Sequence, residues 1–166
     1  MAKTVIKFGL SEKEIERAIK EVAQFKKEFL EKCSRLVEEL TNRGEMVAKI
    51  QVAQLDAVYT GELMNSIEGF YDPPSHVGII KAGAIYAAYV EYGTGVVGKQ
   101  SPHPDPHPTW QYDSKQHGDE GWVYHDDDTG QFRWTKGFKS RPFMYNTARE
   151  LEKECARIAR EVFGKQ

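Results

Sequence analysis

The chain has 166 residues, of which 40% are hydrophobic and 29% are charged, a composition typical of a soluble globular protein with a single modest core. Because 23 lysines and arginines nearly balance 25 acids, the net charge of −2 gives no support for a dedicated nucleic-acid binder, which would be basic. No run approaches the ~18 apolar residues of a membrane span, and we expect no secretory signal because the first residues lack an apolar stretch. Cys33 and Cys155 stand alone within helical patterns and are expected to be reduced core thiols of a cytoplasmic product.

A long amphipathic helix is expected to begin at Ser11, which opens a capping-box pattern. Apolar residues then recur at alternating four- and three-residue spacing, which is one face of a helix: Ile15, Ile19, Val22, Phe29, Cys33, Leu36 and Leu40. Only Lys26 interrupts this face. We expect the helix to end near Asn42 with Gly44 as its C-cap, and a second helix to follow at 45–58. A helix of about 30 residues leaves part of its apolar stripe uncovered in so small a domain, which favours packing against a second copy or against the C-terminal helix.

Residues 60–83 combine a short helix with two strands. Thr60 is expected to cap a helix over 60–67. Two strands are expected at 68–72 and 76–83, because a proline-rich turn separates two runs of strand-forming residues.

The stretch YAAYVEYGTG at 86–95 carries aromatic and apolar residues at three- and four-residue spacing, which predicts a helical turn. Gly93 is expected to end this turn, because glycine adopts φ > 0 without a Cβ clash. Glu91 is the only charge in the stretch, and a carboxylate among aromatic residues must reach water or find hydrogen-bond donors. The pattern alone leaves open whether Glu91 is an exposed acid on a short amphipathic helix or part of a contact.

Residues 96–137 differ in character from the rest of the chain. Proline alternates with polar residues in SPHPDPHPTW, which predicts an extended loop. Two aromatic runs at 122–125 and 131–135, separated by Asp-rich turn residues and a glycine, predict a β-hairpin. We interpret the segment as an insertion that projects from the domain. It holds every tryptophan of the chain, which suggests a contact with a partner through Trp110, Trp122 and Trp134.

The last helix is expected to begin after Pro142, which suits a first helical turn, and to end at Gly164. Its apolar residues follow the same spacing as the first helix: Met144, Ala148, Leu151, Cys155, Ile158 and Val162. Together the elements predict an α+β fold, with the long N-terminal helix and the C-terminal helix packed on a small antiparallel β-sheet. We expect residues 1–166 to form a single domain with the projecting loop and hairpin as an insertion at about 96–137.

The residues with the strongest metal-ligand character are His103, Asp105 and His107, with His117, His125 and Asp126 to Asp128 nearby in sequence. Alternating prolines spread the histidines along an extended chain, so a proline-rich spacer is favoured over a metal site. The run DDDTG lacks the spacing and the terminal glutamate of a calcium loop, which favours a hairpin turn. No G-x-S-x-G and no phosphate-binding loop occurs, so nothing supports an enzyme, and we expect no metal and no cofactor.

Three motifs occur in a fixed order: TGELMNSI at 60–67, YAAYVEYGTG at 86–95 and RPFMYNTA at 141–148. Their order and spacing resemble the tail-component family of long-tailed bacteriophages. Members of this family are also described as neck or tail-completion proteins and are similar to the minor tail protein Z of phage lambda. The chain departs from the family pattern at Val58 and Tyr59, where relatives often carry proline, and in its longer insertion.

The resemblance implies a structural virion protein rather than an enzyme, made in the host bacterial cytoplasm and located in the virion. Such proteins resemble ring formers, most often hexamers, which complete the tail and join it to the head. The expected partners are further copies of the chain, adjacent head-completion and tail-terminator or tail-tube proteins, and genomic DNA that passes without sequence-specific binding; no membrane is expected. We place the subunit interface at Tyr89, Glu91, Tyr92, Thr94, Arg141 and Phe143.

Charge is uneven along the chain, since residues 101–135 hold seven acids and two bases. Residues 136–166 hold eight bases and four acids, and the opposite signs of the two segments favour docking between copies or partners. An acidic segment facing a channel would repel phosphate and let DNA slide, whereas Arg149, Arg157 and Arg160 could instead grip it. Two alternative functions stay open, a metal-dependent hydrolase that uses the His/Asp-rich loop and an interaction module outside any phage.

Overall fold

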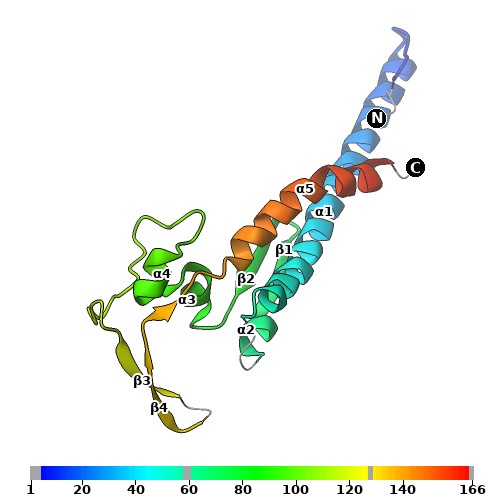
Figure 1. The fold of residues 1–166 in the computed structure, drawn as a ribbon. Coiled ribbons are helices and arrows are strands. Elements are labelled where there is room, and N and C mark those ends of the chain that lie inside the picture. Colours follow the sequence, from blue (N-terminus) through cyan, green and yellow to red (C-terminus); the bar gives the residue numbers. More distant parts are fainter. Residues whose placement is uncertain (1–4, 58–60, 127–128, 165–166) are drawn as a thin grey trace.

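Two long antiparallel helices form the axis of the protein (Figure 1). The computed structural model describes residues 5–57, 61–126 and 129–164. Helix α1 spans Glu12–Gln54 and helix α5 spans Phe143–Gly164. The rings of Phe29 and Phe163 lie 5.7 Å apart at one end of the helix pair, and Asn146 donates a hydrogen bond to Gln51 at the other. The α+β expectation is confirmed, because α1 and α5 pack against each other and the protein also contains small two-stranded antiparallel sheets.

Helix α1 does not end near Asn42, and the separate helix expected at 45–58 is its continuation to Gln54. The prediction failed because Gly44 resembles a C-cap in sequence but serves packing. A Cβ at this position would overlap Ile80 Cδ1 and would lie 2.9 Å from Leu151 Cδ1. Gly44 therefore lets a strand and helix α5 approach the middle of α1 closely.

The sheet that packs on α1 is an antiparallel hairpin of β1, Ile67–Asp72, and β2, Val77–Ala82, which confirms the two expected strands. One face turns toward α1, where the Gly69 N–H donates to Glu45 Oε2 over 2.8 Å. On the opposite face Phe70 and Ile79 are directly paired and exposed. The hairpin thus has one face covered by a helix and one face open.

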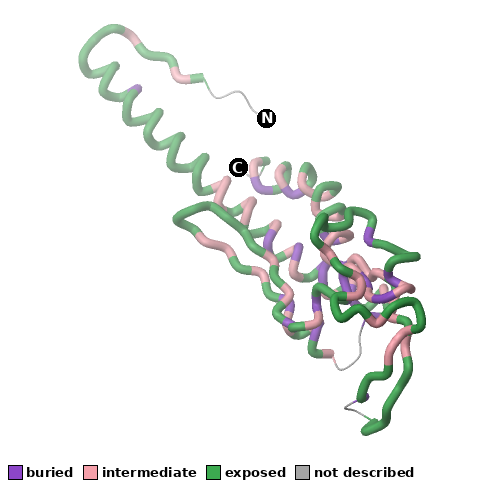
Figure 2. Tube along the Cα trace, turned by 90° about the vertical axis from the view of Figure 1, so that its left-hand side faces the viewer, coloured by how far each residue is buried: buried purple, intermediate pink, exposed green. Residues whose placement is uncertain are grey.

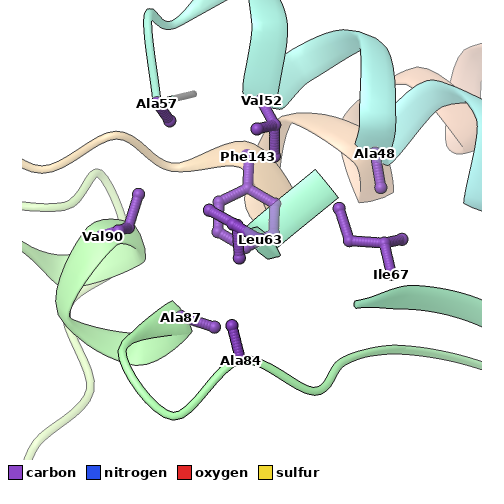
Figure 3. Close-up of a cluster of buried hydrophobic side chains, with 9 residues drawn as sticks. All are labelled: Ala48, Val52, Ala57, Leu63, Ile67, Ala84, Ala87, Val90 and Phe143. Atoms are coloured by element: carbon purple, nitrogen blue, oxygen red, sulfur yellow. The ribbon is translucent and has the colours of Figure 1, made fainter. Parts of the chain in front are cut away.

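The core is small and lies where α1, the sheet and the start of α5 meet (Figure 3). Phe143 is its largest fully buried side chain. The members of the core come from five separate segments: Ala48, Val52, Ala57, Leu63, Ile67, Ala84, Ala87, Val90 and Phe143.

Three short helices complete the body: α2 over Glu62–Asn65, α3 over Ala87–Tyr92 and α4 over Gly95–Gln100. Gly93 ends α3 with φ of 79°, as expected. Helix α4 was not expected, since the sequence predicted an extended loop from residue 96. Thr60, the expected cap of α2, lies outside the described residues, and Gly61 takes the N-cap position.

The insertion ends in a second antiparallel hairpin, as the aromatic runs predict. Strand β3, Trp122–Asp126, pairs with β4, Gln131–Thr135, and the short β5, Gly137–Phe138, follows. This hairpin points away from the helices at the end of the molecule opposite the start of α1 (Figure 1).

Residues 12–28 of α1 extend beyond the end of α5 and are almost entirely exposed (Figure 2). The overhang is about 25 Å long at 1.5 Å per residue. Its apolar residues include Ile19, which is 63% exposed, and Val22, which is 53% exposed. None of the described helices is long and apolar enough to cross a membrane.

Replacement of Gly44 by leucine is expected to destabilise the protein by about 1–3 kcal/mol, because the new side chain has to displace Ile80 and Leu151. The measurement is urea unfolding followed by far-UV circular dichroism. Gly164→Leu is the control, because a Cβ at that position meets nothing within 4 Å. A Gly44→Leu midpoint equal to or above that of the wild type would contradict the packing role.

The ion pair between α1 and α5 predicts a loss of stability in acid. The pKa of Glu154 lies below its usual value because the Arg43 guanidinium donates hydrogen bonds of 2.6 and 2.7 Å to its carboxylate. A carboxyl whose pKa is lowered by folding stabilises the protein above its ordinary pKa, and this contribution disappears as the pH falls through the lowered value.

The unfolding midpoint of Glu154→Gln should therefore lie below that of the wild type near pH 7, and the difference should close as the pH falls through the lowered pKa of Glu154. Glu152→Gln is the matched control, since this exposed glutamate of the same helix pairs only with Arg149 across the surface. A difference that stays constant with pH would show that the ion pair is not its source.

Candidate functional site

The start of α5 is capped from a distance by Glu91. Pro142 precedes the helix and has no side-chain acceptor, so the first N–H groups of α5 need an acceptor from elsewhere. Glu91 Oε2 accepts the N–H of Met144 over 2.9 Å, and Oε1 accepts that of Tyr145 over 3.0 Å. The carboxylate also lies where the helix dipole favours negative charge. Although Glu91 is only 7% exposed, its charge is stabilised by these donors.

The third donor to Glu91 is His103, which is 5% exposed. His103 Nε2 lies 2.9 Å from Glu91 Oε1. The N–H of Asp105 donates to His103 Nδ1 over 2.9 Å, which assigns the proton of a neutral ring to Nε2. The Asp105 carbonyl oxygen lies 2.6 Å from the same Nδ1, so this nitrogen has a partner in either protonation state. Through Glu91, His103 therefore holds the proline-rich loop at the start of α5.

Aromatic rings enclose this polar pair. The Tyr92 ring lies 4.7 Å from His103 and 5.0 Å from Trp110 between ring centroids. Tyr145 meets His103 edge-on at 5.3 Å. Burial, followed by the charges of Glu91 and Asp105, raises the pKa of the Tyr92 hydroxyl. The rings exclude water from the pair, which strengthens its hydrogen bonds.

Glycines allow the segment after α3 to cross the chain that leads back from the second hairpin. Gly93 and Gly95 have φ of 79° and 61°, and a Cβ on either would meet backbone atoms of residues 136–140. Thr94 forms an isolated antiparallel bridge with Phe138. The Thr94 hydroxyl is buried and is the one buried side-chain polar atom of the described residues without a hydrogen-bond partner.

Comparisons of the chain with protein-family models, with curated proteins and with solved structures found no match. The assignment of function therefore rests on the residues and their geometry. Within the described part of the chain, no three His, Cys, Asp or Glu side chains are grouped so that they could hold a metal ion. A hollow of about 410 Å³ beside His103 is lined by Tyr92, Tyr145 and Phe143, but the polar atoms of the Glu91–His103 pair already have partners in the chain.

The six residues expected at a subunit interface lie close together, but several of them serve the fold. Phe143 is in the core, and Glu91 is buried in its own chain. Arg141 donates to the Leu55 carbonyl and lies over the Phe138 ring, so its partner within the chain is not Glu91. Thr94 and Tyr92 are half-buried, and Tyr89 is exposed beside Trp110 at 5.5 Å. We also expected that Glu91→Ala would weaken assembly without unfolding the monomer. This expectation is corrected here, because the buried carboxylate has three partners in its own chain.

The three tryptophans differ in exposure. Trp110 donates its ring N–H to the Gly93 carbonyl, and Trp122 stacks on His117 at 4.6 Å. Trp134 is exposed on the second hairpin, with the Lys136 ammonium 5.6 Å from its ring centroid. Only Trp134 of the three is therefore available as a large anchor for a partner.

Two exposed apolar surfaces emerge from the structure. The first, which we name the α1 seam, runs along the overhang of α1 to Phe29, which lies beside Phe163 at the base of the overhang. It consists of Ile15, Ile19, Val22 and Phe29, interrupted by Lys26. The second, the hairpin face, is one side of β3 and β4, where the pairs Val123–Trp134 and His125–Phe132 lie next to each other, and its exposed apolar residues are Val123, Phe132 and Trp134. The helical spacing in the sequence predicted the α1 seam. For the hairpin only the tryptophans were predicted to contact a partner, although the alternation of side chains along a strand predicts the complete face.

The Glu91–His103 pair was missed because its members are twelve residues apart and the third element starts at residue 143. One sequence signal could have found it. A helix that begins with proline, without a Ser, Thr, Asp or Asn at its start, needs an acceptor from another segment, and Glu91 is the only acid in its apolar surroundings.

Replacement of Glu91 by alanine should destabilise the monomer by about 3 kcal/mol, because three buried donors lose their acceptor. Urea unfolding gives the size of the effect, and near-UV circular dichroism reports on the rings around Tyr92. The matched control is Glu68→Ala, which removes an exposed pair with Lys81 and should cost less than about 1 kcal/mol. Equal midpoints for the two variants would overturn the capping role of Glu91.

Proposed function

We propose that this protein is a structural subunit of a bacteriophage virion, located at the neck or at the tail-proximal junction, where copies of the chain form a ring. The observation that carries the proposal is the α1 seam, an apolar helix face on which Ile19 is 63% and Val22 is 53% exposed. In proteins an amphipathic helix is stabilised mainly by the packing of its apolar face against another surface. A second protein surface is the natural cover for the α1 seam.

The two exposed apolar surfaces support a ring rather than a two-fold dimer. The overhang of α1 and the second hairpin lie at opposite ends of the molecule in both views (Figures 1 and 2). Surfaces that differ from each other and lie at opposite ends suit head-to-tail contacts, which form rings when the rotation between copies closes. Each copy then covers one surface of each neighbour.

The phage assignment rests on the three sequence motifs, and their positions in the fold support it. The motifs at 60–67, 86–95 and 141–148 contribute side chains to one core, among them Leu63, Val90 and Phe143. Motifs far apart in a sequence occur together in a family when the fold brings them into contact. The insertion at 96–137, one of the two places where the chain departs from the family pattern, projects from this common core.

Passage of DNA without gripping agrees with the charges of the last helix. Arg149 forms an ion pair with Glu152, and Arg157 with Glu154 and Glu161. Arginines already paired with carboxylates neutralise fewer phosphates, so we favour DNA that slides past the ring over DNA that is held by α5.

The proposal is tested in particles made by the bacterium that carries the gene. Mass spectrometry of purified particles should detect the chain in about as many copies as one ring contains. Deletion of the gene should yield separate heads and tails in electron micrographs, and the wild-type gene supplied on a plasmid should restore joined particles. Complete infectious particles that contain none of this polypeptide would refute the proposal.

A further inference from the structure

We propose that the hairpin face of one copy packs against the α1 seam of the next copy, an inference that rests on the proposed self-assembly and names its contact. The occupant of the α1 seam is thus a second copy of this chain, and each copy presents both halves of the contact. The result is a helix that lies across a two-stranded sheet supplied by a neighbour.

The chain already uses this kind of packing within itself. The carboxyl-terminal half of α1 lies on the β1–β2 hairpin, with Gly44 beneath Ile80 and Thr41 against Gly69 and Gly78. The amino-terminal half of the same helix lacks such a hairpin, and the β3–β4 hairpin lacks a helix among the described residues. A two-stranded hairpin is marginally stable in water unless a helix or further strands cover an apolar face. The proposed contact provides each element with the partner that its counterpart has inside the chain.

The areas of the two surfaces agree with one interface. On the hairpin face Phe132 is 77% exposed and Trp134 is 59% exposed. Scaling ~200 Å² for a large apolar side chain by the exposed fractions gives roughly 400 Å² for each surface. Their sum, roughly 800 Å², is close to the non-polar part of a standard interface, which buries about 1,600 Å² in total and is a little over half non-polar.

Charge is consistent with the same pairing. Lys26 is the single charge within the α1 seam, and the segment 101–135 that carries the hairpin holds seven acids and two bases. The segment that carries the hairpin is therefore acidic overall, which favours its approach to Lys26 over the approach of a second α1 seam with its own Lys26.

The test uses one variant for each surface. Ile19→Glu disables the α1 seam and Phe132→Glu disables the hairpin face, and both positions are exposed, so that each variant should keep the wild-type far-UV circular dichroism. The mass of each purified protein is measured by light scattering after size exclusion and by native mass spectrometry. The wild type should assemble, and each variant alone should associate at least tenfold more weakly.

A mixture of the two variants distinguishes the contact between hairpin face and α1 seam from a contact between two α1 seams. The intact hairpin face of Ile19→Glu fits the intact α1 seam of Phe132→Glu, so the mixture should form a complex of two chains that grows no further. Ile85→Glu is the matched control, because Ile85 is 95% exposed and lies outside both surfaces, and this variant should assemble like the wild type.

Three results would overturn the inference. Wild-type assembly by Phe132→Glu would indicate contacts between two α1 seams, and wild-type assembly by Ile19→Glu would indicate that the hairpin docks on another face, such as Phe70 and Ile79 of the first sheet. A wild type that stays monomeric at every concentration would exclude the contact. These results leave the particle experiment independent, since the chain can be found in virions by mass spectrometry whichever surfaces it uses.

Discussion

The carboxylate of Glu91 is the acceptor on which the arrangement of the body depends. It binds the first N–H groups of α5 through Met144 and Tyr145 and the ring of His103, so three segments distant in sequence meet at one side chain. Because burying a charge costs free energy, the three hydrogen bonds together are needed to offset the desolvation of the carboxylate. The position of α5 along α1, and with it the place where α1 emerges from the body, follows from this contact.

The body so formed is small for a chain of this length, and much of the apolar surface lies outside it. The core occupies the junction of α1, the first sheet and α5, whereas the overhang of α1 and the second hairpin project from opposite ends (Figures 1 and 3). One helix therefore has two roles, since its second half organises the core and its first half presents a surface to the exterior. Exposed apolar surfaces of this kind suit a component of an assembly, which is the physical basis of the function proposed here.

Local sequence patterns predicted the elements that depend on local physics. Both hairpins and α5 follow from strand alternation, turn residues and helical spacing, and the structure contains them close to the expected bounds. Gly44 was misinterpreted because a glycine that ends a helix and a glycine that admits a neighbour have the same sequence signal, and only the contact with Ile80 separates them. The role of Glu91 could not be predicted from its own stretch, because its donors come from residues 103 and 144–145, and such pairings are fixed by tertiary packing. The candidate interface residues come from the motifs at 86–95 and 141–148, and the fold buries Glu91 and Phe143 but exposes Tyr89.

Helix α1 passes from the core into the overhang without a break. Gly44 does not interrupt the helix, because it is packed between β2 and α5. The overhang is therefore a rigid helical extension of the core rather than a flexible segment. At 1.5 Å per residue its tip lies about 25 Å from the end of α5, so a tilt of about 10° at that point displaces the tip by roughly 4 Å. A small adjustment in the packing at the base of the overhang is in this way enlarged at its tip. In the assembly that we propose, the curvature would then depend on the packing inside each monomer.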